Sequence, residues 1–250
     1  ASIEAVGLIE NPAVRVIDTS TAHRVDPDWA YGFPELSPDF RRRIAGGNRV
    51  ASPGCHAGGF VALVYPLVEA GVLPVSALLT CHSVTGYSGG GKKMIAQYEA
   101  GDRDGALSSP RQYGLTQVHK HLPEMKGIPG LQFDPVFCPI VADYLCGMVV
   151  TVPLHKCQLM GGADLGAIKE ILRAKYTGPV VKYTDNLDEN GFIAANTLAD
   201  TDAMEVTAVG NDDRFLLISR FDNLGKGASG AALQCLNIML GEPETKGLIL

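Results

Sequence analysis

The sequence predicts an α/β protein with two parts, a doubly wound α/β part followed by an α+β domain. Two observations indicate the first part. Val14–Asp18 is rich in β-branched residues and runs into a polar loop, Thr19–Arg24, and a Pro-Gly-Cys turn later leads into an apolar run. The second part is indicated by strand-like runs with segregated helices. With 250 residues, 46% of them hydrophobic, the chain can bury one large core or two modest ones.

The first part is expected to alternate helices and strands. Ser2–Ile9 has the pattern of a short helix, and Val14–Asp18 that of a buried strand. Tyr31–Phe40 is rich in proline and is expected to be a connection. Asn48–Ala51 is a short strand, and a buried helix is expected to begin near Cys55. In open α/β sheets, ligands bind at the carboxyl ends of such strands.

The second part contains most of the predicted strands, and the residues between Lys93 and Gly147 are expected to be largely irregular. The strands at Ala203–Val209 and Arg214–Arg220 flank a Gly-Asn-Asp-Asp turn and are expected to pair. The remaining predicted elements are strands at Ala77–Val84, Gly147–Val152 and Val180–Tyr183 and helices at Gly166–Lys175 and Gly227–Leu240.

Composition argues against several classes of protein. The net charge is −6 and the only basic run is Arg41–Arg43, so we expect no nucleic-acid partner. No apolar stretch is long enough to span a membrane, and no leader pattern is present. The six cysteines form no CxxC pair, so neither a metal site nor a disulfide framework is expected, and a reducing cytoplasm fits best. The chain opens at Ala1 with what resembles the inside of a domain, so we expect an N-terminal segment to be missing.

Cys55 is the most informative residue. It lies between Pro53-Gly54 and two further glycines, directly before an apolar run, which places its sulfur near a helix N-terminus. There the helix dipole and the free N–H groups stabilise a thiolate, and a thiolate at neutral pH is a nucleophile. The alternative is a buried structural cysteine, the usual state of a free thiol.

A nucleophilic cysteine needs an acid–base partner. His56 is adjacent in sequence, but adjacent side chains diverge on a helix. His119 and His121 are better candidates, because alternation in an extended segment puts both on one face and Lys120 on the other. A solvated basic loop is the alternative interpretation.

Two glycine-rich segments are candidate binding loops. Gly86–Lys93 resembles an anion cradle, with exposed N–H groups supplemented by Ser88, Lys92 and Lys93, although a flexible hairpin would look the same. Asp222–Gly230 leads into a helix through small residues that a ligand or another backbone can approach closely. Asn223 offers the donor and acceptor that suit a carboxamide, and simple helix packing is the alternative.

Six motifs in order along the chain resemble those of the shorter type of N-acetyl-γ-glutamyl-phosphate reductase. Any one of them is weak, but the ordered set spans nearly the whole chain. They are Asp18–Arg24, Tyr31–Glu35, Ser52–Cys55, Ser83–Lys93, His119–Met125 and Asp222–Gly230.

The resemblance implies roles for particular residues. Cys55 corresponds to the catalytic nucleophile and one of His119 and His121 to the acid–base, with His119 preferred. The substrate's acyl phosphate is expected near Ser88, Gly89, Gly90, Lys92 and Lys93. NADP is the implied cofactor, bordered by Ser20, Thr21, Asn223, Lys226 and Gly227.

The resemblance also implies the architecture, that of the semialdehyde dehydrogenase superfamily. Residues 1–55 would be the remainder of a Rossmann-type NADP-binding domain, residues 56–221 an α+β catalytic and dimerisation domain, and residues 222–250 a helix that returns to the first domain. The family's initial strand and glycine-rich phosphate loop do not precede Ser2. A homo-oligomer, dimer or tetramer, is expected. The apolar Gly147–Val152 is a candidate interface strand, and burial against the protein's own helices is an equal alternative.

The implied reaction is reduction of an acyl phosphate in arginine biosynthesis. The Cys55 thiolate attacks the acyl carbon, phosphate leaves, and the resulting thioester accepts a hydride. Related reductases of aspartyl or N-acetylaminoadipyl phosphate are alternatives, because the pocket residues that measure side-chain length are not evident in the sequence. A cofactor-free thiol hydrolase using Cys55 and His119, or a non-catalytic dimerisation fragment, are alternatives from other classes.

Overall fold

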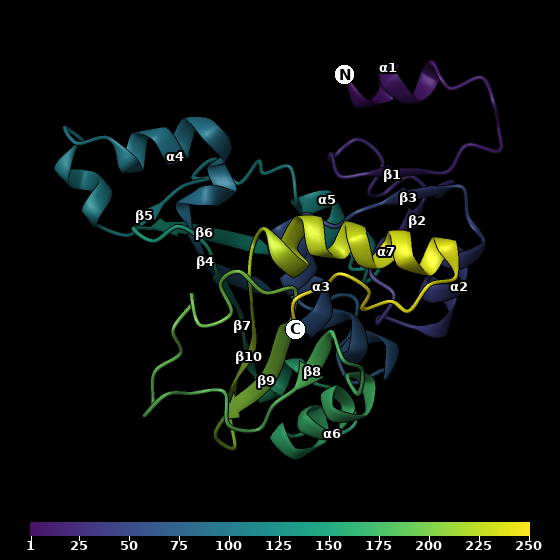
Figure 1. Cartoon of the computed structure of the whole chain (residues 1–250). Coiled ribbons are helices and arrows are strands. Elements are labelled where there is room, and N and C mark those ends of the chain that lie inside the picture. The colour runs from purple at the N-terminus through teal and green to yellow at the C-terminus, as the bar shows by residue number, and fades with distance from the viewer.

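A small parallel sheet is built by the first part of the chain. The computed structural model describes residues 1–250, and this sheet consists of β1 (Val16–Asp18), β3 (Arg49–Ala51) and β2 (Ala30–Tyr31), in that order. Helices α2 (Pro38–Gly46) and α7 (Gly230–Leu240) pack beside it (Figure 1), while α1 (Ser2–Gly7) contributes no buried residue. Ala30, Ile44 and Val50 share a core with Cys235, Ile238 and Met239 of α7, so the end of the chain completes this layer.

A seven-stranded mixed sheet forms the second part. Its order is β5-β6-β4-β7-β10-β9-β8, with β4 parallel to β6, β8 parallel to β9, and the other neighbours antiparallel. The strands are β4 (Thr80–Gly86), β5 (Arg111–Gln112), β6 (Val136–Ala142), β7 (Met148–His155), β8 (Val181–Tyr183), β9 (Met204–Gly210) and β10 (Arg214–Phe221).

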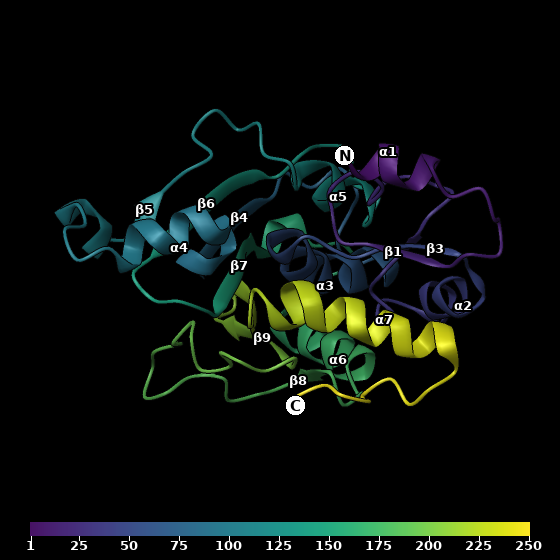
Figure 2. The ribbon, with the colours of Figure 1, turned by 45° about the horizontal axis from the view of Figure 1, so that its top comes forward.

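Helix α3 (Cys55–Glu69) is the central element of the core. It packs against β7 and β10 on one face of the mixed sheet, and α6 (Leu165–Lys175) packs beside it against β9 (Figure 2). The helix is apolar almost throughout, as expected for a helix buried on all sides. The main hydrophobic cluster joins α3 to the inward-facing residues of the sheet, including the fully buried Phe60, Phe137 and Phe221.

The predicted α/β class is confirmed, and so are the predicted strands and helices, with boundaries shifted by a few residues. Two of the wrong predictions concern long segments expected to lack regular structure. The proline-rich Tyr31–Phe40 contains the start of α2, because Ser37 accepts a hydrogen bond from Phe40 N–H and Pro38 occupies the first turn, where proline is tolerated.

The second wrong prediction was that the residues after Lys93 are largely irregular. They contain α4 (Gly91–Glu99), α5 (Leu122–Gly127) and the strand β6. Pro139 lies inside β6, which argues against a strand when judged from sequence. Parallel pairing with β4 along seven residues outweighs that local signal.

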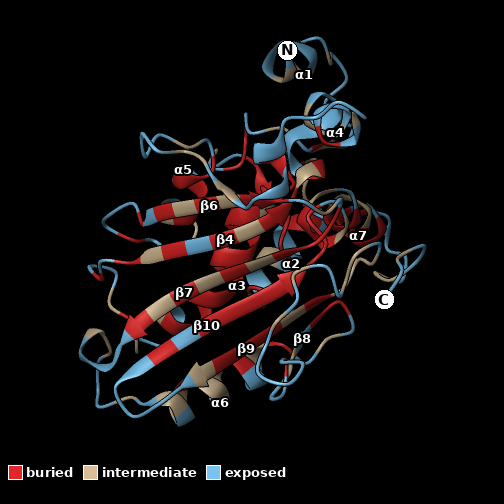
Figure 3. Ribbon diagram, turned by 90° about the vertical axis from the view of Figure 1, so that its left-hand side faces the viewer, coloured by how far each residue is buried: buried red, intermediate tan, exposed pale blue.

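The other face of the mixed sheet carries no helix over its central strands (Figure 3). Strand β7 alternates strictly, with Met148, Val150 and Val152 buried beneath α3 and the residues between them half-exposed on the opposite face. None of the helices is long and apolar enough to cross a membrane.

Candidate active site

A cavity of about 500 Å³ lies where the two sheets meet. The carboxyl ends of β1, β3, β4, β6 and β10 all lead to it, and α3 begins in its wall. Binding at the carboxyl ends of strands is the usual arrangement in open α/β proteins. Among the residues that line the cavity are Arg24, Cys55, His56, Ser88, Gly89, Gly90, Tyr113, His119, Lys120, His121, Asn223 and Gly227.

Cys55 is the first residue of α3, as the sequence predicts, and its position in the cavity wall depends on the turn before it. Gly54 precedes the helix with extended backbone, and a methyl group on Gly54 would meet His121 Nε2 at 2.5 Å. A residue with a side chain does not fit there, because the backbone before Cys55 packs directly against a buried imidazole.

The electrostatics at Cys55 differ from the expectation of a preformed thiolate. Burial raises the pKa of the Cys55 thiol to about 11, although the His56 N–H, Arg24 and Lys120 act in the opposite direction. Desolvation outweighs the helix terminus, so the resting group is the thiol. A nucleophile at this position therefore requires a base that removes the thiol proton.

A buried ion pair lies beneath the start of α3. Arg24 donates to Glu124 Oε1 at 2.8 Å, and Glu124 Oε2 accepts from the Gly54 N–H at 2.9 Å and from the Tyr31 hydroxyl at 3.2 Å. The remaining Arg24 donors reach the backbone carbonyls of Ser52 and Thr19. This network ties the end of β3, the residue before Cys55 and α5 into one rigid unit.

Three imidazoles cluster beside the cysteine. The ring centroids of His119 and His121 lie 4.8 Å apart, and His56 lies 5.9 Å from His119 and 5.5 Å from His121. His119 and His121 share the cavity as predicted, but through a turn rather than an extended segment, since Leu122 N–H bonds to His119 C=O. Lys120 lines the same cavity instead of pointing away from it.

The two candidate acid–base residues differ in exposure. His121 is buried, its Nδ1 has no hydrogen-bond partner, and burial holds the pKa of its imidazole far below the usual range. His119 is half-buried, and burial lowers its pKa as well. Of the two, only His119 combines a place in the cavity wall with access to solvent.

The glycine-rich segment is helical, which corrects the expectation of a loop or hairpin. Tyr87–Gly90 forms a 3₁₀ turn and α4 begins at Gly91. Ser88, Gly89 and Gly90 line the cavity, whereas Lys92 and Lys93 in the first turn of α4 are exposed and do not line it.

Asn223 lines the cavity, but its amide is hydrogen-bonded mainly to other groups of the protein. Its Oδ1 accepts from Gly147 N–H at 2.9 Å, and its Nδ2 donates to Ser88 Oγ at 2.8 Å. One amide hydrogen is then left for a ligand. Asn223 thus joins the ends of β10, β7 and β4, and it holds Ser88 in the wall.

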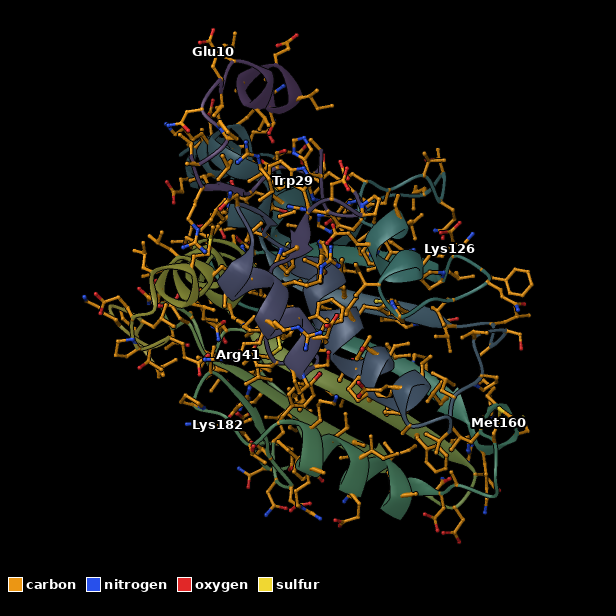
Figure 4. All side chains as sticks on the ribbon, turned by 90° about the vertical axis from the view of Figure 1, so that its right-hand side faces the viewer. Glu10, Trp29, Arg41, Lys126, Met160 and Lys182 are labelled. Atoms are coloured by element: carbon orange, nitrogen blue, oxygen red, sulfur yellow. The ribbon has the colours of Figure 1, made fainter.

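Three residues expected near the cofactor lie outside the cavity lining. Ser20 donates to the Asp18 carboxylate through its N–H and its hydroxyl, and Thr21 is exposed. Asp18 also binds His23, which stacks on Trp29 at 4.0 Å (labelled in Figure 4).

Lys226 is the third. It is buried against Glu35, whose two carboxylate oxygens accept its Nζ at 2.9 Å, and it also donates to Gln234. Lys226 is thus paired with a carboxylate inside the protein. The same contacts hold the start of the π-helical turn Gly225–Ser229 to the layer of the small sheet. The adjacent Gly227 does line the cavity.

Four residues of the site were not selected from the sequence: Arg24, Tyr113, Lys120 and Glu124. Arg24 and Glu124 lie within motifs quoted for the family resemblance, but no local pattern indicates that two residues 100 positions apart form a buried pair. Tyr113 lies in the stretch expected to be irregular.

Comparison with known families covers both parts of the chain. Residues 55–223 match the family model described as semialdehyde dehydrogenase, dimerisation domain. N-acetyl-gamma-glutamyl-phosphate reductase of Rhizobium meliloti (strain 1021) is 45% identical over 247 residues, which are 96% of this chain and 80% of the relative. The protein of the same name from Brucella ovis is 43% identical over 249 residues, 97% of this chain and 80% of the relative.

Solved structures show the same fold at low identity. Aspartate semialdehyde dehydrogenase II from Vibrio cholerae superposes with a TM-score of 0.67 at 16% identity, covering 90% of this chain and 72% of that one. The enzyme from Francisella tularensis gives a TM-score of 0.67 at 15% identity, with 90% and 74% covered. The predicted superfamily is thereby confirmed, and the chain belongs to the N-acetyl-gamma-glutamyl-phosphate reductases of the semialdehyde dehydrogenase superfamily.

Proposed function

We propose that this chain reduces N-acetyl-γ-glutamyl phosphate to the corresponding semialdehyde and phosphate, the oxidoreductase step that its relatives' name describes, within arginine biosynthesis. One observation carries the proposal. A single cavity brings Cys55 at a helix N-terminus together with His119, Lys120 and the Ser88 hydroxyl. This set comprises a nucleophile, a base and donors for an anion, the parts that acyl transfer from a phosphate requires.

The chemistry begins with removal of the thiol proton. His119 takes the proton from Cys55, because the raised pKa of the thiol leaves little thiolate at neutral pH. The sulfur then forms a bond to the acyl carbon, and the bond between that carbon and the phosphate oxygen breaks. The product is a thioester on Cys55, and phosphate leaves with the two electrons of the broken bond.

The cavity supplies groups for the departing phosphate. Lys120 contributes a positive charge, and the Ser88 hydroxyl, whose oxygen accepts from Asn223 Nδ2, contributes its own hydrogen as a donor. We assign this role to Lys120 in place of Lys92 and Lys93, which are exposed in α4. After the thioester is reduced, the sulfur leaves as thiolate and His119 returns the proton to it.

NADP is the proposed cofactor, and the residues present fit its reactive end. Thr19, Ser52, Gly227 and Ala228 line the same cavity as Cys55 and carry small side chains or none, which suits the close approach of a flat ring. The remaining N–H of Asn223 suits a carboxamide oxygen. The reduced cofactor supplies the hydride when bound there.

The experiment that tests the function is the phosphate-dependent reverse reaction. The purified full-length protein is incubated with N-acetylglutamate semialdehyde, phosphate and NADP, and the absorbance of the reduced cofactor is followed. Cys55→Ser is expected to abolish the signal, while Cys157→Ser, an exposed cysteine, leaves it unchanged. Turnover in the Cys55 variant would exclude the thioester route, and a preference for aspartate semialdehyde would assign the related reductase.

We further propose that two copies pair through the open face of the mixed sheet. Half-exposed apolar side chains from neighbouring strands occupy it, Val84, Ile140 and Val149, together with the exposed Leu216. The matched family model is a dimerisation domain and includes these strands. An exposed apolar face of this kind is typical of an interface.

Thr151 on β7 lies opposite His82 and Ile218 in register, near the centre of that face. Thr151→Arg is expected to convert dimers to monomers in sedimentation velocity at micromolar concentration, since an unpaired cation would be buried in the interface. A wild-type protein that sediments as a monomer would refute the pairing. A cytoplasmic location is proposed as well, because all six cysteines are free.

A further inference from the structure

His56 is adjacent to Cys55 in sequence but has a different environment. Its ring is buried, with Nδ1 at 2.6 Å from Ser83 Oγ and Nε2 at 2.8 Å from Tyr113 Oη. The rings of His119, His121 and Phe137 pack around it at centroid distances of 5.3 to 5.9 Å. Both ring nitrogens are therefore engaged with hydroxyl groups, each of which can donate or accept.

The protonation state of His56 follows from burial. Desolvation lowers the pKa of its imidazole to about 3, and the neighbouring His119 and Lys120 act in the same direction. The neutral ring carries one N–H and one bare nitrogen. The question is which nitrogen carries the hydrogen.

Ser83 decides between the two forms. Its side chain points inward from the middle of β4 and is fully buried, and His56 Nδ1 is the single hydrogen-bond partner of its hydroxyl. A buried donor without an acceptor costs about 1–3 kcal/mol. The Ser83 hydroxyl therefore donates to Nδ1, and the proton of the ring resides on Nε2.

The tautomer of His56 determines how Tyr113 faces the cavity. Nε2–H donates to Tyr113 Oη, so the hydrogen of the Tyr113 hydroxyl is not used by His56, and this hydroxyl has no other protein partner. Tyr113 lines the cavity, and burial together with Cys55 raises the pKa of its phenol, which keeps that hydrogen in place. With the opposite tautomer of His56, the Tyr113 hydroxyl would donate to Nε2 and would present only its lone pairs to the cavity.

We propose that Ser83 and His56 are positioning residues that fix Tyr113 as a hydrogen-bond donor to the anionic acyl phosphate or to the oxyanion formed at Cys55. This inference rests on the proposed function for the identity of the anion. The tautomer itself, Nε2–H on His56, depends only on the three side chains and can be tested without substrate.

The first measurement is therefore spectroscopic. Protein labelled with ¹⁵N-histidine is examined by long-range ¹H–¹⁵N correlation, and the His56 signals are assigned by their loss in His56→Gln. We expect a bare Nδ1 and a protonated Nε2 in the wild type. In Ser83→Ala the donor to Nδ1 is absent, so the other tautomer should become populated. A wild-type ring protonated at Nδ1 would overturn the inference.

The second measurement is kinetic, in the phosphate-dependent assay. Tyr113→Phe is expected to lower kcat/KM about 10- to 100-fold, as for loss of one hydrogen bond to a charged group. Ser83→Ala should lower it less, because the correct tautomer remains partly populated. Ser219→Ala is the matched control: it removes another buried hydroxyl, one that donates to Gly59 C=O beneath the same sheet, and should change neither the tautomer nor kcat/KM.

The outcomes separate the two proposals. An inactive wild type with the expected tautomer would refute the proposed function and leave the Ser83–His56–Tyr113 chain intact. An active wild type whose kcat/KM is unchanged by Tyr113→Phe would refute the donor role alone. Thermal unfolding of each variant shows whether a loss of activity follows from a loss of fold.

Discussion

Replacing Glu124 by alanine removes the carboxylate that binds Arg24, the Gly54 N–H and the Tyr31 hydroxyl. Arg24 is buried, so the variant leaves its guanidinium in the interior without a carboxylate partner. Breaking a buried pair by removing one partner costs about 3–5 kcal/mol. This is a large part of the total of about 5–15 kcal/mol for a typical protein.

Urea denaturation followed by circular dichroism measures this loss. Glu124→Gln keeps the shape and one acceptor oxygen, so we expect a smaller loss of about 1.5–3 kcal/mol. Asp185→Ala is the matched control, because Asp185 is likewise paired with an arginine, Arg173, but at the surface, where the pair contributes little. A loss below about 1 kcal/mol in Glu124→Ala would refute a structural role for the buried pair.

Glu124 also acts on the cysteine. Its negative charge contributes to the raised pKa of the Cys55 thiol, while Arg24 opposes it. Glu124→Gln should therefore lower the pKa of Cys55 and speed its alkylation by iodoacetamide near pH 8. The rate of an otherwise identical Asp185→Ala protein should not change. A slower rate in Glu124→Gln would mean that geometry, not charge, dominates at this site.

Three further predictions concern acid stability, packing and the phosphate. Because the pKa of His56 is lowered to about 3, the unfolded chain binds a proton below pH 6.5 that the folded one does not, so stability falls as pH falls from 6.5 toward 3. His56→Gln should remove about 2 kcal/mol of that loss at pH 5, seen as a shallower dependence of the urea midpoint on pH. Gly59→Ala should destabilise by about 1–3 kcal/mol in thermal unfolding, since an added methyl group would lie within 3.0 Å of side chains from β7 and β10; an unchanged Tm would refute it. Lys120→Ala should raise KM for phosphate, whereas Lys92→Ala with Lys93→Ala should leave it nearly unchanged, and the reverse pattern would return the phosphate role to α4.

Local patterns in the sequence predict local backbone. The β-branched run at Val14–Asp18 forms β1, and the Pro-Gly turn before an apolar run places Cys55 at the start of α3. All of the sequence motifs except Tyr31–Glu35 also supply residues to the cavity. Elements whose local signals conflict were missed: Pro139 lies within β6, and α2 begins inside a proline-rich stretch.

The state of each functional group was decided by the tertiary structure. The thiol of Cys55 is at a helix N-terminus in either view, but only the packed structure shows that burial raises its pKa to about 11. The sequence around Lys226 is that of a free cation, but in the folded chain its amino group is paired with Glu35, 191 residues away. Desolvation and pairing depend on which distant segments come together, and the sequence near a residue carries no record of them. The sequence by itself therefore determined the family, most of the strands and the place of Cys55 at a helix N-terminus, while the fold determined which groups are buried, paired or open to the cavity.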